Sequence, residues 1–459
     1  MKALLQKHKT LIFLLLITFL LRFILFLIFM PWKPEMENNV VLLYDAVGYQ
    51  KLALSILHFF HIKTEVLRTP IYPAFVAGIY AIFGIKPYIV IFFQILLSTC
   101  TAYFFYKIVE QLCSQKVANI ALLIFAIEPT LILYTTFLYS EILFMFFTIL
   151  SLWMLLLGLK NQQIKYFILS SIALGLATLT RPAGQYLILV HIIIILIYNR
   201  NYIQNIKYAT VIFLIYIVSI SPWAIRNYVF HGRLKISSTM EHNALILSSF
   251  YTAFKSSPLP KDTIINQFLV QVKLMAPDSL KDKMPTNAVE LNKSQSFENT
   301  EVFAKVAKQY LMSHKKEFIL AQIKGAINLH INMGTEQYML RLHQETKRWN
   351  IRDKVSLGLF GAAKKFFATK TPTEIFLGLS ILLVLGIIYF STIIGIFYLI
   401  KQKKYFVLLF CILNIGYYVA LSSIYPTPRF RNPFMPFYIF LASVGINYLM
   451  TKKHVLENQ

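Results

Sequence analysis

The residue types best suited to chemistry in this chain are two carboxylates, several arginines and a row of tyrosines, gathered in six short motifs. The motifs are Tyr44-Asp45 with Tyr49, Arg68-Thr69-Pro70-Ile71-Tyr72-Pro73, Tyr139-Ser140-Glu141, Thr180-Arg181-Pro182, Pro222-Trp223-Ala224-Ile225-Arg226-Asn227-Tyr228, and Pro426 to Pro436 with Arg429 and Arg431. A carboxylate can take a proton from a hydroxyl within hydrogen-bond reach, and a guanidinium can grip a phosphate through two parallel hydrogen bonds. The set is therefore typical of a site that acts on an anionic substrate.

The elements that carry these motifs are predicted to be membrane-spanning helices. Hydrophobic residues make up 57% of the chain and charged residues 14%, whereas a soluble domain carries about 25% charged residues. Spans are predicted at 11–30, 88–109, 117–134, 141–159, 166–180, 184–199, 207–222, 375–400, 405–422 and 433–450. The first run is not a cleavable signal, because it is long, lacks a small-residue cleavage site and is followed by further spans. We expect an all-α polytopic membrane protein with about 10–12 transmembrane helices.

The distribution of Lys and Arg predicts the orientation. If the short apolar stretch 70–84 does not span, one side of the membrane collects almost all the basic residues of the short loops: Lys2, Lys7, Lys9, Lys107, Lys116, Lys160, Lys165, Arg200, Lys207, Lys401, Lys403, Lys404, Lys452 and Lys453. The short loops opposite hold only Arg181, Arg429 and Arg431. Because short loops rich in Lys and Arg are cytoplasmic, we expect both termini inside and 70–84 in the outer interface.

Three regions follow from this topology. Residues 1–222 are expected to form a transmembrane module with a first outer loop, 31–87, that prolines divide into short interfacial helices. Residues 223–374 would form a large, mainly helical outer loop, and residues 375–459 the last transmembrane helices. All six motifs then face outward, although the choice of orientation rests on Lys and Arg counts alone.

Asp45 and Glu141 are the candidate catalytic carboxylates. Asp45 and Tyr49, four residues apart, share one face of a helix, and Asp45 is a candidate general base, although a helix cap or a solvated loop aspartate would give the same pattern. Glu141 opens a span, where an acid also suits the helix dipole. Glu128 lies deeper in the membrane, where charged groups are usually paired or functional. We expect a structural role for Glu128, with Arg22 as its candidate partner.

The predicted substrate-binding arginines are Arg68, Arg181, Arg226, Arg429 and Arg431. Any one of them could be an interfacial anchor whose side chain reaches the lipid headgroups. The positive-inside rule predicts few arginines on the outer face, so their excess favours binding of an anionic group, most simply a phosphate. The neighbouring tyrosines complete the predicted binding set: Tyr44, Tyr49, Tyr72 and Tyr139.

Motifs for several other chemistries are missing from the sequence. The chain has no Walker loop, dinucleotide fingerprint, zinc motif or nucleophile elbow, and its three cysteines lie in or beside spans. We therefore predict no metal, no cofactor and no disulfide framework. The net charge of +25 suits contact with anionic membrane lipids, and no basic stripe of a soluble fold points to nucleic acid.

In order and spacing, the motifs resemble the polytopic GT-C glycosyltransferases that use polyprenyl-phosphate sugars. The resemblance is strongest to the family 39-like branch, related to the protein O-mannosyltransferases and the lipid A aminoarabinose transferase. The matching residues are Tyr44-Asp45 with Tyr49 and Ala53, Arg68 to Pro73, Glu128-Pro129, Tyr139 to Glu141, Gly175 to Pro182, Pro222 to Tyr228, and Arg429 to Pro436. The resemblance covers most of the chain except 250–370.

The resemblance implies roles for particular residues: Asp45 as the catalytic acid/base, Glu141 as a second acidic position and Arg68 near the lipid phosphate. It implies an inverting transfer of a hexosyl or pentosyl group from a polyprenyl phosphate to an envelope lipid, glycan or protein, at the periplasmic or exterior face of a bacterial inner membrane. The first loop has a single Asp where the protein mannosyltransferases have an Asp-Glu pair, which argues against a protein acceptor.

Two other functions stay open from the sequence: a lipid-linked sugar flippase or transporter, and a polymerase or ligase of surface polysaccharide. Transporters place polar groups near the bilayer midplane, whereas the ionisable groups here cluster at one edge. A polymerase or ligase would share the outward-facing, arginine-rich site, so only its substrates would distinguish it.

Overall fold

The computed structural model describes residues 2–58, 65–344, 346, 359–425 and 427–457, and every regular element in these ranges is helical. Pro426, at the start of the last motif, lies outside the described residues. Each predicted span coincides with a helix or a bent pair: α1 (Lys2–Phe29), α5 (Pro87–Leu112), α6 (Gln115–Ile127) with α7 (Pro129–Leu133), α8 (Glu141–Asn161), α9 (Ile164–Thr180), α10 (Leu187–Tyr198), α11 (Tyr202–His231), α21 (Pro372–Lys401), α22 (Tyr405–Ser422) and α23 (Met435–Glu457). The predicted class, an all-α polytopic membrane protein, is confirmed.

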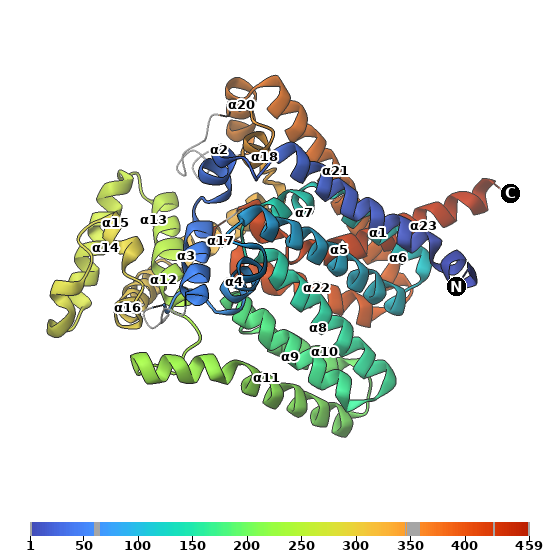
Figure 1. Ribbon diagram of the computed structural model, residues 1–459, viewed down its shortest axis with the longest axis horizontal. Helices are drawn as coiled ribbons and strands as arrows, with labels where there is room; N and C mark the ends of the chain where they lie inside the picture. Colours follow the sequence, from blue (N-terminus) through green and yellow to red (C-terminus); the bar gives the residue numbers. More distant parts are fainter. Residues whose placement is uncertain (1, 59–64, 345, 347–358, 426, 458–459) are drawn as a thin grey trace.

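Length and composition set the number of candidate spans. Among the described residues, six helices are long and apolar enough to cross a membrane, or up to eight if each bent pair is one span, while α9 and α10 belong to the shorter apolar helices. Both termini lie at one end of the long axis of the molecule and helices α14 and α15 lie at the other (Figure 1). Helices α14 and α15 of the large loop between α11 and α21 therefore lie at the end of the molecule opposite the termini (Figure 1).

The bundle packs closely where glycines meet a neighbouring span. Gly395 of α21 lies directly against the backbone carbonyl of Leu441, and Gly445 of α23 lies against that of Ser391, so an added Cβ at either glycine would collide with backbone. Small residues allow membrane helices to approach in this way. The α21–α23 pair thereby fixes α23, which begins just after the Arg429 loop.

A break in one span carries the buried charges Arg22 and Glu128. Helices α6 and α7 meet at Glu128 with a bend of 59°. Arg22 donates to the carbonyls of Phe125 and Ala126 at 3.2 and 3.3 Å, at the open end of α6. Glu128 accepts from the Leu131 backbone N–H at 2.6 Å and so caps α7. Among the described residues no direct ion pair joins Arg22 and Glu128, although the two charges attract each other across the break. Each charge satisfies backbone groups on one side of that break.

The first loop, between α1 and α5, consists of short helices as predicted. These are α2 (Pro34–Met36), η1 (Glu37–Val41), α3 (Asp45–Leu57) and α4 (Ile71–Phe83). The chain turns by 110° between η1 and α3. Helix α4 is only about 20 Å long at 1.5 Å per residue, well short of the roughly 30 Å hydrocarbon core. Helix α10, with 12 residues, is no longer than α4, so the interfacial position of 70–84 stays a prediction from the charge distribution.

The large loop is helical and has a hydrophobic core of its own. Its elements are α12 (Thr239–Asn243), η4 (Ala244–Ser249), α13 (Phe250–Ser256), α14 (Lys261–Met275), η5 (Asp278–Lys283), α15 (Ala288–Lys293), α16 (Phe297–Ser313), α17 (Lys315–Ile331), α18 (Thr335–Arg341) and α20 (Leu359–Thr369). The buried residues of this core include Phe268, Val272 and Phe303. Helix α11 continues to His231 and α21 begins at Pro372, so both flanking helices extend into the expected range 223–374.

Candidate active site

Asp45 begins α3, and the residue before it has an uncommon backbone conformation. Tyr44 has φ 55° and ψ −121°, values unusual for a residue with a side chain and often found at functional sites. The turn places Asp45 at the positive end of the α3 dipole, with 39% of its side chain exposed. Tyr44 is 70% exposed, so both members of this motif face outward from the protein.

Arg429 joins the two predicted catalytic carboxylates. It lies in η6 (Pro428–Arg431), in the loop between α22 and α23. Its Nη1 donates to Asp45 Oδ2 at 2.8 Å, and its Nε lies 2.6 Å from Glu141 Oε1. The guanidinium also stacks on Tyr139, 4.6 Å from the ring centroid. Residues that the sequence analysis grouped on one face are thus in direct contact.

Glu141 is the buried carboxylate of the pair. It is the first residue of α8 and 1% exposed, and Arg181 Nη1 forms a short ion pair with its Oε1. The same Arg181 nitrogen lies 3.4 Å from Ser140 Oγ, which is 2.9 Å from the Tyr49 hydroxyl. Both oxygens of Glu141 are buried, so this carboxylate holds two guanidinium groups and offers no edge to a substrate.

Arg68 approaches Asp45 from the other side. Its Nη2 is 3.6 Å from Asp45 Oδ1, and its guanidinium lies 5.4 Å from the centroid of the Tyr49 ring. Within the described ranges, the Arg68 side chain donates no hydrogen bond, and 19% of it is exposed. Its N–H groups are therefore available to an anion, unlike the Arg429 Nη1, which is engaged by Asp45.

The charges in this cluster do not balance. Three guanidinium groups, from Arg68, Arg181 and Arg429, surround the carboxylates of Asp45 and Glu141, which leaves one positive charge in excess. Among the described residues, no group of three or more His, Cys, Asp or Glu side chains could hold a metal ion. The electrostatics of the site are set by these five side chains, and the excess charge favours an anionic ligand.

The guanidinium groups also decide the protonation state of Asp45. Burial alone would raise the pKa of Asp45, but Arg429, followed by Arg68 and Arg181, outweighs it and holds the pKa below its ordinary value of 3.8. The pKa of Arg429 in turn is raised well above its ordinary value, because Glu141 and Asp45 offset the effect of its burial. Asp45 is thus ionised at neutral pH, as a base must be.

The predicted tyrosines mostly organise the site. The Tyr72 hydroxyl donates to Gln94 Oε1 at 2.8 Å, and Gln94 Nε2 donates to the carbonyls of Thr135 and Phe137 at 3.1 and 2.6 Å. These bonds fix the chain that leads from the α6–α7 break into Tyr139 and Glu141. Tyr49 packs edge-on against Tyr72 at a centroid distance of 4.7 Å. Tyr49, Tyr72 and Tyr139 therefore position the charged groups, and Tyr44 is the exposed member of the set.

Arg226 and Arg431 have other neighbours than the carboxylates. Arg226 Nη1 donates to the Glu65 carbonyl at 2.8 Å, and its guanidinium stacks on Trp223 at 4.6 Å. Arg431 is fully buried and donates from Nη1 to three carbonyls at the end of α17, those of Leu329, His330 and Asn332, at 3.2, 2.9 and 2.9 Å. In the structure these two arginines therefore contact backbone carbonyls and an aromatic ring, and substrate binding by them stays a prediction.

Sequence reasoning missed one buried arginine near the site. Arg341, in α18, is 1% exposed. Its Nε donates to Thr136 Oγ1 at 2.6 Å, and its guanidinium lies 3.4 Å from the centroid of the Phe137 ring. Arg341 therefore supports the segment before Tyr139 from a part of the chain in which no motif was recognised. The sequence sign that could have indicated Arg341 is its position among the apolar residues Met339, Leu340 and Leu342.

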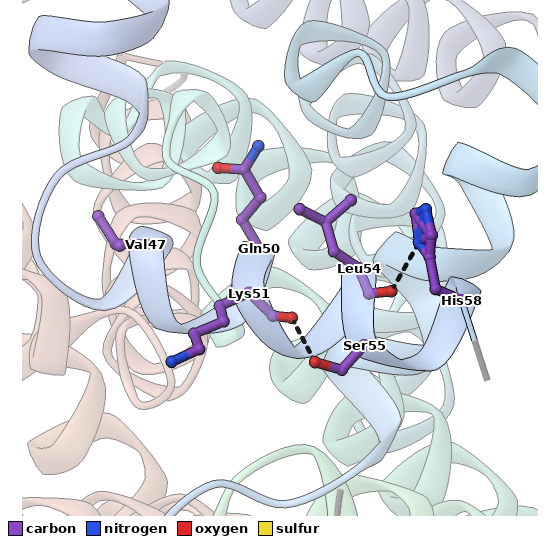
Figure 2. A pocket seen from close by; sticks show the side chains of 6 residues that line it. All are labelled: Val47, Gln50, Lys51, Leu54, Ser55 and His58. Carbon is purple, nitrogen blue, oxygen red and sulfur yellow. Dashed lines mark hydrogen bonds between the residues drawn. The ribbon is translucent and has the colours of Figure 1, made fainter. Parts of the chain in front are cut away.

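The exposed face of α3, opposite the face that packs into the protein, borders an open depression of about 410 Å³. Its lining residues come from successive turns of that helix: Val47, Gln50, Lys51, Leu54, Ser55 and His58 (Figure 2). Tyr49 and Leu52, in contrast, lie on the buried face of α3. The helix thus presents a mixed polar surface outward, while its other face and its first residue build the charged cluster.

Comparison with solved structures identifies the fold. The oligosaccharyltransferase AglB from the archaeon Archaeoglobus fulgidus, solved with an inhibitory peptide and a dolichol-phosphate, matches 99% of this chain with a TM-score of 0.51 at 14% identity. The chain has the GT-C fold. The same enzyme tethered to an acceptor peptide gives a TM-score of 0.50 at 14% identity and 99% coverage of this chain. This GT-C chain spans about half of the archaeal enzyme, 52% and 51% in the two structures.

A protein-family model and one further solved structure also match parts of this chain. Residues 67–225 match the family described as dolichyl-phosphate-mannose-protein mannosyltransferase. ArnT from Cupriavidus metallidurans, bound to undecaprenyl phosphate, matches 95% of this chain over 77% of its own length, at 10% identity and a TM-score of 0.41. Curated proteins give no match. The resemblance to GT-C glycosyltransferases inferred from the motifs is confirmed.

Proposed function

We propose that this protein transfers a sugar from a polyprenyl-phosphate donor to a hydroxyl or phosphate group of a cell-envelope acceptor, at the outer face of the membrane. One observation carries the proposal: the exposed carboxylate of Asp45 lies between Arg68 and Arg429 in a cluster with excess positive charge. Transfer from a phosphate-linked sugar needs a base for the acceptor and positive charge for the departing phosphate. The GT-C fold supports the same class of reaction.

In the proposed reaction an acceptor hydroxyl attacks the anomeric carbon of the donor sugar. The new glycosidic bond forms as the bond between that carbon and the phosphate oxygen breaks. Asp45 takes the hydroxyl proton, and polyprenyl phosphate leaves with the bonding electron pair. Because Glu141 is buried, a single carboxylate can reach the sugar, which favours one displacement with inversion at the anomeric carbon.

Arg68 is the proposed ligand of the donor phosphate. Its side-chain donors form no hydrogen bond among the described residues, and its guanidinium is partly exposed beside Asp45. A planar guanidinium can bind two phosphate oxygens at once. The charge of Arg68 lowers the pKa of Asp45. A phosphate bound to Arg68 would offset that charge and so raise the pKa of Asp45. Donor binding would thus raise the basicity of Asp45 as the acceptor arrives.

The proposed location is the bacterial inner membrane, with the cluster facing the periplasm or exterior. Ser256 on the large loop and Gln402 between α21 and α22 are both exposed. In intact cells, a cysteine at Ser256 should react with an impermeant maleimide and a cysteine at Gln402 should not. Labelling at Gln402 alone would reverse the orientation and contradict an outward-facing site.

The direct test of function uses the purified protein in vesicles with a polyprenyl-phosphate sugar labelled in the sugar. A transferase releases polyprenyl phosphate and moves the label to an envelope-lipid or glycan extract. A flippase would leave the donor intact and change only the leaflet that holds it, and this outcome would reject the proposal. Products that grow by repeated units would instead identify a polymerase. Lipid profiling of a deletion strain by mass spectrometry would then identify the acceptor.

A further inference from the structure

We propose that Gly48 and the turn at Glu65 are positioning residues that place the Arg68 guanidinium against Asp45. The inference rests on the proposed function, because it assigns a purpose to the position of Arg68 at the donor site. Neither Gly48 nor Glu65 touches the reacting groups in this proposal. Both act through Arg68, one by leaving space for its guanidinium and the other by fixing its backbone.

Gly48 provides the space. A Cβ added at Gly48 would lie 2.5 Å from Arg68 Cζ, 2.6 Å from its Nη2 and 2.8 Å from its Nη1. The guanidinium thus lies flat on the backbone of α3, one turn after Asp45 and beside the Tyr49 ring. Alanine is a better helix former than glycine, so helix formation does not explain glycine inside α3. The guanidinium of Arg68 does.

Glu65 fixes the backbone from which the Arg68 side chain leaves. Its Oε1 accepts from the backbone N–H groups of Leu67 at 2.9 Å and Arg68 at 2.6 Å. The carbonyl of Glu65 accepts from Arg226 Nη1 at 2.8 Å. One carboxylate therefore closes the turn, and Arg226 holds the turn to α11.

The segment after α11 fastens the same turn from a second direction. The backbone N–H of Ser238 donates to the Val66 carbonyl at 2.8 Å, and the hydroxyls of Ser237 and Thr239 donate to the Leu67 carbonyl at 2.5 and 2.7 Å. With the backbone fixed on both sides, Arg68 can respond to a change at Gly48 only through its side chain.

A displaced guanidinium has little room behind its present position. A void lined by Leu52, Glu65, Arg68, Thr69 and Trp223, among others, has a volume of about 10 Å³, no more than one water molecule occupies. A methyl group at Gly48 would therefore drive the guanidinium out toward the solvent and away from Asp45. The fold around it would stay intact, because only the far end of a flexible side chain must move.

The test measures binding of polyprenyl phosphate to the full-length protein in detergent, by native mass spectrometry, and transfer activity in parallel. Gly48→Ala should weaken binding about tenfold, the loss expected for one charge-assisted hydrogen bond, without lowering the unfolding temperature. Gly78→Ala in neighbouring α4 is the matched control, because an added Cβ there meets nothing within 4 Å. Glu65→Ala should weaken binding by a similar route and serves as the second variant if Gly48→Ala is poorly produced.

Arg68→Ala separates positioning from general damage. In that background Gly48→Ala should add no further loss, since the group it displaces is already absent. If Gly48→Ala and Glu65→Ala bind like the wild type while Arg68→Ala binds weakly, the positioning role is wrong and the proposed transferase stands. If the wild type transfers no sugar but Gly48→Ala still weakens binding through Arg68, the proposed function fails and the positioning role stands.

Discussion

Asp45 and Glu141 are bound by the same arginine, yet their surroundings differ. Arg429 reaches Asp45 through Nη1 and Glu141 through Nε. The side chain of Asp45 is 39% exposed, whereas that of Glu141 is 2% exposed. Asp45 is the first residue of a short helix in the first loop, and Glu141 is the first residue of a candidate membrane-spanning helix. An exposed carboxylate can meet a substrate and change its protonation state; a buried one is committed to its partners.

The difference divides the site into a reactive and a supporting half. Asp45, Arg68 and Tyr44 form the half that faces outward, and Glu141 with Arg181 forms the half that lies within the bundle. Arg429 contacts a carboxylate in each half, so a substitution in the supporting half should also displace Arg429 from Asp45. Substitution of Asp45 is therefore expected to lower the reaction rate, and substitution of Glu141 to lower the stability of the protein.

The largest effect on catalysis is expected from Asp45→Asn. The change keeps the size of the side chain and removes its basicity, and loss of a general base typically lowers the rate about 10²–10⁴-fold. The unfolding temperature should change little, because Asp45 is partly exposed and Glu141 still holds Arg429. Glu35→Gln, an exposed acid in the same loop, is the control and should keep full activity. Wild-type transfer by Asp45→Asn would remove Asp45 as the base.

Glu141→Gln should instead destabilise the protein. It leaves Arg181 and Arg429 facing a neutral amide, and breaking a buried ion pair costs about 3–5 kcal/mol. The measurement is the thermal unfolding temperature in detergent, alongside activity per folded protein. Glu374→Gln is a matched control, since Glu374 is also fully buried and pairs with Lys370 at 2.9 Å, away from the site.

The two buried glutamates should differ in activity. Both variants should unfold at lower temperature, but only Glu141→Gln should lose activity per folded molecule, because only Glu141 orients Arg429. An unchanged unfolding temperature in Glu141→Gln, with activity lost as in Asp45→Asn, would make Glu141 a direct participant and break the division between the two halves.

Arg429→Gln should reveal the link between the halves as a pH effect. The folded-state pKa of Asp45 is depressed, so the active carboxylate persists as the pH falls and is lost only below the ordinary value of 3.8. Removing Arg429, the largest stabilising charge, leaves burial to raise that pKa. The acidic limb of kcat/KM should therefore move to higher pH, and less so in Arg429→Lys. The position of the limb is independent of the amount of folded enzyme, and an unmoved limb would show that Asp45 is not the titrating base.

The sequence predicted the apolar helices, because hydrophobic length is a local property of the chain, whereas the membrane face that carries the site stays a prediction. It also predicted Asp45, Glu141, Arg68, Arg181 and Arg429, which the structure brings together. It did not predict which arginine meets which carboxylate. Asp45 and Arg429 are 384 positions apart, and their pairing depends on how the first loop packs over the last spans.

The same limit explains what was missed. The need for glycine at position 48 is visible only once Arg68 is placed on α3, because nothing in the local helical pattern requires it. Arg341 was missed because its partner Thr136 lies 205 positions away. Arg431 looked equivalent to Arg429, two residues before it, until burial showed that it binds the end of α17.

The smallest effect on donor use is expected from Arg431→Met. Methionine keeps much of the buried volume of Arg431 and removes the donor to the last carbonyls of α17. A favourable charge at a helix C-terminus contributes typically 0.3–1 kcal/mol, and up to about 2 kcal/mol when partly buried, so the unfolding temperature should fall modestly. The apparent donor constant should stay within about twofold of the wild type, whereas Arg68→Lys, which replaces a planar fork with a point charge, should raise it about tenfold. A donor constant raised equally by both substitutions would place Arg431 in the reactive half, and the assignment of its guanidinium to α17 alone would be wrong.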